Sequence, residues 1–307
     1  MHPAFSILFF TTLAGAAQGL VVLLAFAVLF GVKLSPGFVP MALVVAELLL
    51  VAGLAASFLH LGRKMRAWRA VLMWRTSWMS REVIVLPAFI ALVALWWLAL
   101  RMGYRAAWLP VLLIVGAVAL WYCTAMIYAC IRFIEEWAHP LTIVNFTLIG
   151  LSSGLILGCA LASLRNDVAL AQAASPWALL VTLMAWASRA LSLRRNAQLR
   201  HKSSLQSATG IAGSQLLQKS MGMSAGAFNT REFFHGAKQL TLSNVKRSFV
   251  LLTFVFPCLL LAWGIASQTT LPLLLAALVQ APGLIAERWF FFAQAKHPQN
   301  LYYQVVS

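Results

Sequence analysis

Two ionisable residues, each beside a long apolar run, have side chains that could handle protons together. His60 lies at the end of the second apolar run of the chain, and Glu82 begins the third. Imidazole titrates near neutral pH, and removal from water moves a carboxyl group toward the same range. Because oxidation or reduction of a quinone moves two electrons and two protons, this pair would suit a quinone headgroup. Spacing alone leaves an alternative open, in which His60 caps its helix and Glu82 pairs with Arg81 or Arg75 at the surface.

The segment between these two residues mixes tryptophans with basic side chains. Residues 62–81 contain three tryptophans and six basic residues. Tryptophan rings favour the headgroup region and basic side chains reach past it, so we expect an interfacial basic and aromatic loop. Candidates for the mouth of a quinone pocket are Ser77, Trp78 and Arg81, although interfacial anchoring explains them equally well. Candidates for contact with a docked partner are Arg63, Arg66 and Arg69, for which anionic lipid is the default.

Two further sets of polar residues could have a role. Glu47 lies in the middle of the second apolar run, where an ionisable group is costly and therefore a functional candidate. It could belong to a proton path or pair with Gln18, and the sequence favours neither. A polar group after the fourth run, made of Glu135, Glu136 and His139, lacks the further ligands that a metal would need. We therefore predict a partner contact there and no metal site.

Composition indicates the class of protein that positions these residues. Of 307 residues, 62% are hydrophobic and 10% charged, against about 45–50% and about 25% in soluble domains. Runs of about 18 or more apolar residues are long enough to cross a membrane as helices. Eight such runs predict an all-α polytopic integral membrane protein, with about eight transmembrane helices in a bundle and a single membrane domain over residues 1–307. The predicted spans are Phe5–Val32, Val39–Leu61, Glu82–Met102, Ala107–Phe133, Ile143–Ser163, Pro176–Leu193, Phe249–Ser267 and Leu271–Ala293.

Glycines recur at helical spacing in two of these runs. Gly15 and Gly19 lie in the first run, and Gly150, Gly154 and Gly158 lie in the fifth. Small residues at this spacing let neighbouring backbones approach closely, so we expect these glycines to serve packing.

The basic residues fall mostly on one side of the predicted bundle. Nineteen of the 23 Lys and Arg residues lie on the side of the two termini, and four lie on the other. Cytoplasmic loops carry an excess of Lys and Arg, so we expect both termini in the cytoplasm and no nucleic-acid partner. Residues 194–248 are too long for a simple connection and are predicted to form a cytoplasmic docking loop.

Several segments resemble a known family. MHPAFS with FFTTLAGAAQG, FLHLGR, RTSWMSRE and MIYACIRFIEEWAHPLT are similar to the DmsC/SoeC family, the membrane-anchor subunits of dimethyl sulfoxide reductase-type molybdoenzymes. The likeness covers essentially the whole chain, is specific at the HLG and SRE segments and is looser in the last two spans. It is closer to the SoeC branch, whose complexes oxidise sulfite in the cytoplasm.

The resemblance implies a heterotrimer in the bacterial cytoplasmic membrane. A molybdenum-cofactor catalytic subunit and a four-cluster iron–sulfur subunit would dock on the anchor, which exchanges electrons with ubiquinone or menaquinone. The anchor itself would carry no haem and perform only the quinone half-reaction. The quinol site of the family uses the His of the HLG segment and the Glu that starts the next span, which fall here on His60 and Glu82.

Three other functions compete with this interpretation. A menaquinol-oxidising anchor of a dimethyl sulfoxide reductase is similar in sequence, because an anchor does not fix the direction of electron flow. A transporter would show internal repeats or broken spans, and the two halves have no convincing repeat. A di-haem anchor would need paired histidines within spans, whereas only His60 reaches the end of one. The four cysteines form no CxxC pair, so an iron–sulfur cluster or zinc site in this chain is not expected.

Overall fold

In a computed structural model, the chain folds into helices without strands over the residues that the structure describes, namely 4–59, 64–104, 106–199, 204–213, 215–216 and 239–297. Eight helices in this part are long and apolar enough to cross a membrane. They are α1 (Phe5–Leu29), α2 (Phe38–Leu59), α3 (Trp78–Arg101), α4 (Trp108–Ala129), α5 (Pro140–Leu164), α6 (Val168–Ala197), a seventh made of α9 (Gln239–Val250), η2 (Leu251–Val255) and α10 (Phe256–Ser267), and α11 (Leu271–Ala293). A 3-10 helix, η1 (Lys64–Met73), precedes α3, and α7 (Leu205–Thr209) follows α6. The prediction of an all-α polytopic membrane protein is confirmed.

The sixth and seventh spanning helices are longer than their apolar runs. α6 begins eight residues before the predicted start at Pro176, because the Asp167 carboxylate accepts a hydrogen bond from the Leu170 backbone and caps the helix. α6 also takes up the first four residues of the predicted 194–248 loop, and α9 takes up the last ten. At 30 and 29 residues the two helices exceed the ~20 residues that cross the hydrocarbon. Their ends therefore extend beyond it.

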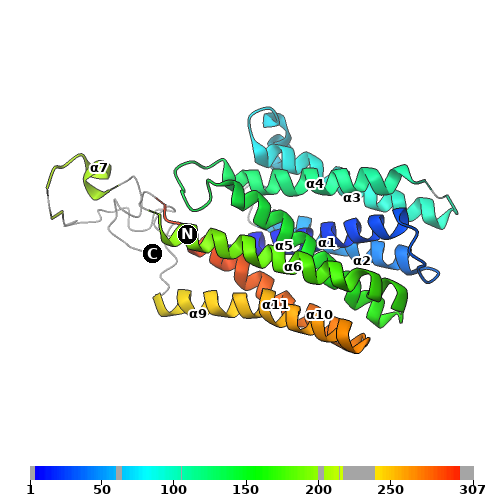
Figure 1. Cartoon of the computed structure of the whole chain (residues 1–307). Helices are drawn as coiled ribbons and strands as arrows, with labels where there is room; N and C mark the ends of the chain where they lie inside the picture. The colour runs from blue at the N-terminus through cyan, green and yellow to red at the C-terminus, as the bar shows by residue number, and fades with distance from the viewer. Residues whose placement is uncertain are drawn as a thin grey trace.

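α5 lies at the centre of the bundle and packs against α1, α4, α6 and α11 (Figure 1). The glycines that were predicted to serve packing lie where α5 crosses α1. A Cβ atom added at Gly154 would lie 2.1 Å from the backbone carbon of Gly19, and one at Gly19 would lie 2.4 Å from the carbonyl oxygen of Gly150. The two backbones meet where no side chain fits, so the packing role predicted for these glycines is confirmed.

We expect Gly154→Ala to destabilise the protein by about 3 kcal/mol, because the added methyl group can be accommodated only if α1 and α5 separate. Unfolding in mixed micelles by titration with sodium dodecyl sulfate would measure the change. Gly53→Ala is the matched control, since its Cβ would make ordinary contacts at 3.5 Å or more with α1. Equal stability of the two variants would contradict a strict need for glycine at the crossing.

Both described chain ends lie at the same end of the bundle, termed the terminal end, and the other is the distal end (Figure 1). Two arginines that were included in the count of basic residues on the side of the termini, Arg189 and Arg288, lie inside α6 and α11 and are buried. Without them, the described connections and helix ends carry 11 basic residues at the terminal end and three at the distal end. The asymmetry of charge therefore survives the correction.

Candidate functional site

Glu82 lies in the first turns of α3 at the terminal end, with its side chain turned into the bundle. The Ser77 side chain accepts a hydrogen bond from the Ser80 backbone and so fixes the start of α3. Glu82 is only 7% exposed, and its Oε1 accepts a hydrogen bond from the Thr124 hydroxyl of α4. A carboxyl group held inside a helix bundle can exchange a proton with a neighbouring ligand without a fixed counter-charge.

Surface pairing of Glu82 with arginine, the alternative left open by the sequence, is wrong. The Arg81 guanidinium donates to the carbonyl oxygens of Trp74 and Arg75, at 2.9 and 2.8 Å. It also lies over the Trp78 ring, 4.0 Å from the ring centroid. Arg81 thus fastens the end of the interfacial loop to the start of α3.

The three residues predicted to line a pocket mouth gather beside Glu82. Trp78 meets Tyr122 of α4 edge to face, with ring centroids 5.3 Å apart, and the Arg81 guanidinium also lies over the Trp78 ring. Ser77 serves as the helix cap. These contacts are structural, and contact with a quinone stays a prediction for Ser77, Trp78 and Arg81.

Two of the predicted residues, His60 and Arg63, lie outside the described residues. α2 ends at Leu59 and packs against α3, which carries Glu82. Among the predicted partner contacts, Arg66 and Arg69 lie in η1 and are exposed, with the Arg69 guanidinium 5.6 Å from the Trp68 ring centroid. Their exposure leaves them free to meet lipid or protein.

Glu47 lies half-buried in α2. Oε2 of Glu47 and Oε1 of Gln18 are buried and have no hydrogen-bond partner among the described residues. A role in a proton path stays a prediction.

The polar group after α4 is built into the helix junction. His139 caps α5, and its Nδ1 accepts a hydrogen bond from the Leu141 backbone at 3.1 Å. Burial, together with the nearby Arg195 guanidinium, lowers the pKa of His139 and so favours the neutral ring that this cap needs. Arg195 of α6 donates to the carbonyl oxygen of Glu135 at 3.1 Å. Within the described residues, no cluster of three His, Cys, Asp or Glu side chains could hold a metal.

A buried charge cluster that was not predicted from the sequence joins α6 to α11. The Arg189 Nε atom lies 2.7 Å from Oε1 of Glu287, and Nη1 of Arg288 lies 3.5 Å from Oε2. The exposed fractions are 1% for Arg189, 1% for Glu287 and 4% for Arg288. The guanidinium of Arg288 covers the Phe146 ring at 3.8 Å, and that of Arg189 lies 5.5 Å from the Phe249 ring centroid. All three charged residues fall within apolar runs of the sequence, and this position was the signal from which the cluster could have been predicted.

A second polar layer lies seven residues, or two helical turns, deeper on each of these helices. Thr182 on α6 and Gln280 on α11 are seven residues from Arg189 and Glu287. The Ser152 and Thr182 hydroxyls lie 2.7 Å apart, and Gln280 Nε2 donates to Ser152 and to the Thr253 carbonyl oxygen, each at 3.2 Å.

An apolar cluster that contains Ile149, Ala185 and Leu284 lies between the two polar layers on α5, α6 and α11. Beside it, a small cavity is lined by Arg288 and by the polar residues Thr11, Thr12 and Ser153.

Comparisons with known proteins agree with the family that the sequence resembles. A family model described as DMSO reductase anchor subunit (DmsC) matches residues 1–294. The C subunit of the sulfite dehydrogenase of Allochromatium vinosum is 46% identical over all of both chains. Two Escherichia coli proteins, the anaerobic dimethyl sulfoxide reductase chains YnfH and C, are each 30% identical over 37% of this chain and 41% of their own length. The chain therefore belongs to the DmsC family, the membrane-anchor subunits of dimethyl sulfoxide reductase-type complexes.

Proposed function

We propose that this anchor subunit exchanges electrons between an iron–sulfur subunit and membrane quinone during sulfite oxidation in the cytoplasm. The observation that carries the proposal is the Glu82 carboxyl group, buried at one end of the bundle and hydrogen-bonded to Thr124. A quinone oxygen that gains or loses an electron needs a proton donor or acceptor within hydrogen-bond reach. Glu82 would fill that role together with His60.

The proposed partners are a four-cluster iron–sulfur subunit and a molybdopterin catalytic subunit, docked at the terminal end. The long ends of α6 and α9, and the exposed Arg66 and Arg69, would contribute to the docking surface. Iron–sulfur clusters and the molybdenum cofactor would belong to these partners. The anchor would work without haem, because in the described residues the two histidines, His139 and His297, lie outside the spanning helices.

The proposed location is the bacterial cytoplasmic membrane, with the terminal end in the cytoplasm. The support is the 11 basic residues at this end against three at the other, counted over the described connections and helix ends. This orientation puts Glu82 on the side where an iron–sulfur subunit in the cytoplasm would deliver electrons.

The second candidate is an anchor that oxidises menaquinol for a dimethyl sulfoxide reductase. Full-length identity of 46% to a sulfite dehydrogenase subunit favours sulfite oxidation, while the similarity to the dimethyl sulfoxide reductase chains covers 37% of this chain. The quinone site would be the same in both, with electrons moving in opposite directions.

An assay of the complex purified with this anchor would test the direction of electron flow. We expect sulfite-dependent reduction of ubiquinone or menaquinone in proteoliposomes, at a rate at least ten times that of dimethyl sulfoxide-dependent menaquinol oxidation. The reverse ratio would establish the second candidate. A complex that oxidises sulfite with a soluble acceptor, yet turns over neither quinone, would contradict a quinone-reactive anchor.

A further inference from the structure

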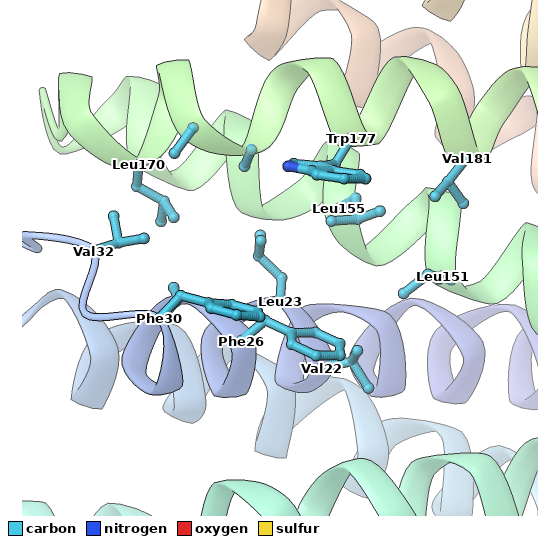
Figure 2. A pocket seen from close by; sticks show the side chains of 13 residues that line it. Val22, Leu23, Phe26, Phe30, Val32, Leu151, Leu155, Leu170, Trp177 and Val181 are labelled. Carbon is cyan, nitrogen blue, oxygen red and sulfur yellow. The ribbon is translucent and has the colours of Figure 1, made fainter.

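An apolar groove with a volume of about 510 Å³ lies between α1 and α6 (Figure 2). Phe26 of α1 and Phe30, directly after α1, form one wall, and Trp177 of α6 forms the other. Leu151 and Leu155 of α5 form the floor. The lining is almost wholly carbon, so the groove suits a hydrocarbon chain.

The groove exists because α5 separates its two neighbours. α1 and α6 both pack closely along α5, yet scarcely touch each other. Small side chains at Ala27, Ala173 and Ala174 keep the space between them open. At the distal end the walls are tied together, since the Asp167 carboxylate at the start of α6 accepts hydrogen bonds of 2.8 Å from the backbone and the hydroxyl of Ser35.

The length of the groove corresponds to one leaflet of a membrane. It runs along α6 from Leu170, near the distal end, to Val181. Eleven residues of helix span ~16 Å, and half of the hydrocarbon core is ~15 Å. The outer parts of the walls are open, with Phe30 80% exposed and Trp177 63% exposed. A chain lying in the bilayer could therefore enter the groove from the side.

Cations lie near the distal mouth of the groove. Lys33 follows the lining residue Val32, and Arg165 lies five residues before the lining residue Leu170; both cations are exposed. The nearby carboxylate of Asp167 is buried and is satisfied by Ser35 and by the Leu170 backbone. Two exposed cations thus stand against one buried carboxylate near the mouth, and this positive balance favours an anionic headgroup.

We propose that this groove binds one acyl chain of an anionic phospholipid in the leaflet at the distal end, with the lipid phosphate held by Lys33 and Arg165. The tail of a quinone fits the observations less well, because Glu82 lies at the opposite end of the bundle on α3. The lipid would fill the space between α1 and α6 and add a wall to the α1–α5–α6 core. The proposal is independent of the function proposed for Glu82.

Native mass spectrometry of the delipidated full-length chain, with phosphatidylglycerol or phosphatidylcholine added, would test it. We expect one phosphatidylglycerol to bind at least ten times more tightly than phosphatidylcholine. Ala173→Trp, which fills the groove at an exposed position, should abolish this binding, whereas Ala91→Trp, at an exposed position of α3, should not. Lys33→Gln combined with Arg165→Gln should remove the preference for phosphatidylglycerol, whereas Arg101→Gln, at the same end on α3, should retain it.

Three results would overturn the proposal. Equal binding in the Ala173→Trp and Ala91→Trp variants would show that the lipid lies elsewhere. Tighter retention of a quinone than of phosphatidylglycerol, lost in Ala173→Trp, would identify the occupant as a quinone tail. A dimer of the chain that Ala173→Trp dissociates would identify it as a second copy.

Discussion

Replacement of Glu82 by glutamine is expected to lower quinone turnover by at least about 100-fold, the usual contribution of a proton-transfer group. Glutamine has the shape of glutamate and can still accept the hydrogen bond from Thr124, but it cannot release or take up a proton. Oxidation of sulfite with a soluble acceptor should be unchanged, because that reaction does not pass through the anchor. The ratio of the two rates in the purified complex measures the effect, and co-purification of the anchor with its partner subunits shows whether the complex has assembled.

Thr124→Val is the matched control for this experiment. It removes the hydroxyl that donates to Glu82 but keeps the carboxyl group. We expect quinone turnover to fall by about tenfold or less, because the variant loses one hydrogen bond of about 1 kcal/mol. Full quinone turnover in Glu82→Gln would show that protons move elsewhere, and Glu47→Gln and His60→Ala in the same assay would identify the residue.

The spanning helices could be predicted from the sequence because burial in lipid demands long apolar runs. Their ends were less certain where composition changes gradually. The first turns of α6, VALAQAAS, are less apolar than the rest, and Pro176 suggested a boundary. In the structure Pro176 lies inside α6, whose start is set by the Asp167 cap.

The position of Glu82 could be predicted, but its contacts could not. Thr124 is 42 residues away in the chain and is an unremarkable polar residue of an apolar run.

The buried cluster of Arg189, Glu287 and Arg288 was missed for a related reason. Arg189 and Arg288 were included in the count of basic residues on the side of the termini, and only the packing of α6 and α11 against α5 brings Arg189 to Glu287, 98 residues away.

Glu287→Gln is expected to destabilise the protein by about 3–5 kcal/mol, the cost of breaking a buried ion pair by removing one partner. Glu287 is the shared counter-charge of two guanidinium groups, each no more than 4% exposed. Its loss would leave two positive charges inside the bundle, beside the Phe249 and Phe146 rings, without the carboxylate that they share. Unfolding by titration with sodium dodecyl sulfate in mixed micelles would measure the change.

Arg189→Met tests whether stability depends on Glu287 pairing with both arginines. Methionine fills much of the space of the arginine stem, and Glu287 keeps Arg288 as its partner at 3.5 Å. One positive and one negative charge then remain, so we expect a loss smaller than that of Glu287→Gln by about 2 kcal/mol, within the range found for coupled neighbours. Equal losses of stability in the two variants would show that the stabilisation comes from the Arg189–Glu287 ion pair and not from Arg288. A buried intramembrane charge can have a structural role or a role in proton transfer, and quinone turnover per assembled complex distinguishes the two. If the cluster is purely structural, the Arg189→Met complex should retain its quinone turnover. If the cluster also transfers protons, quinone turnover should fall.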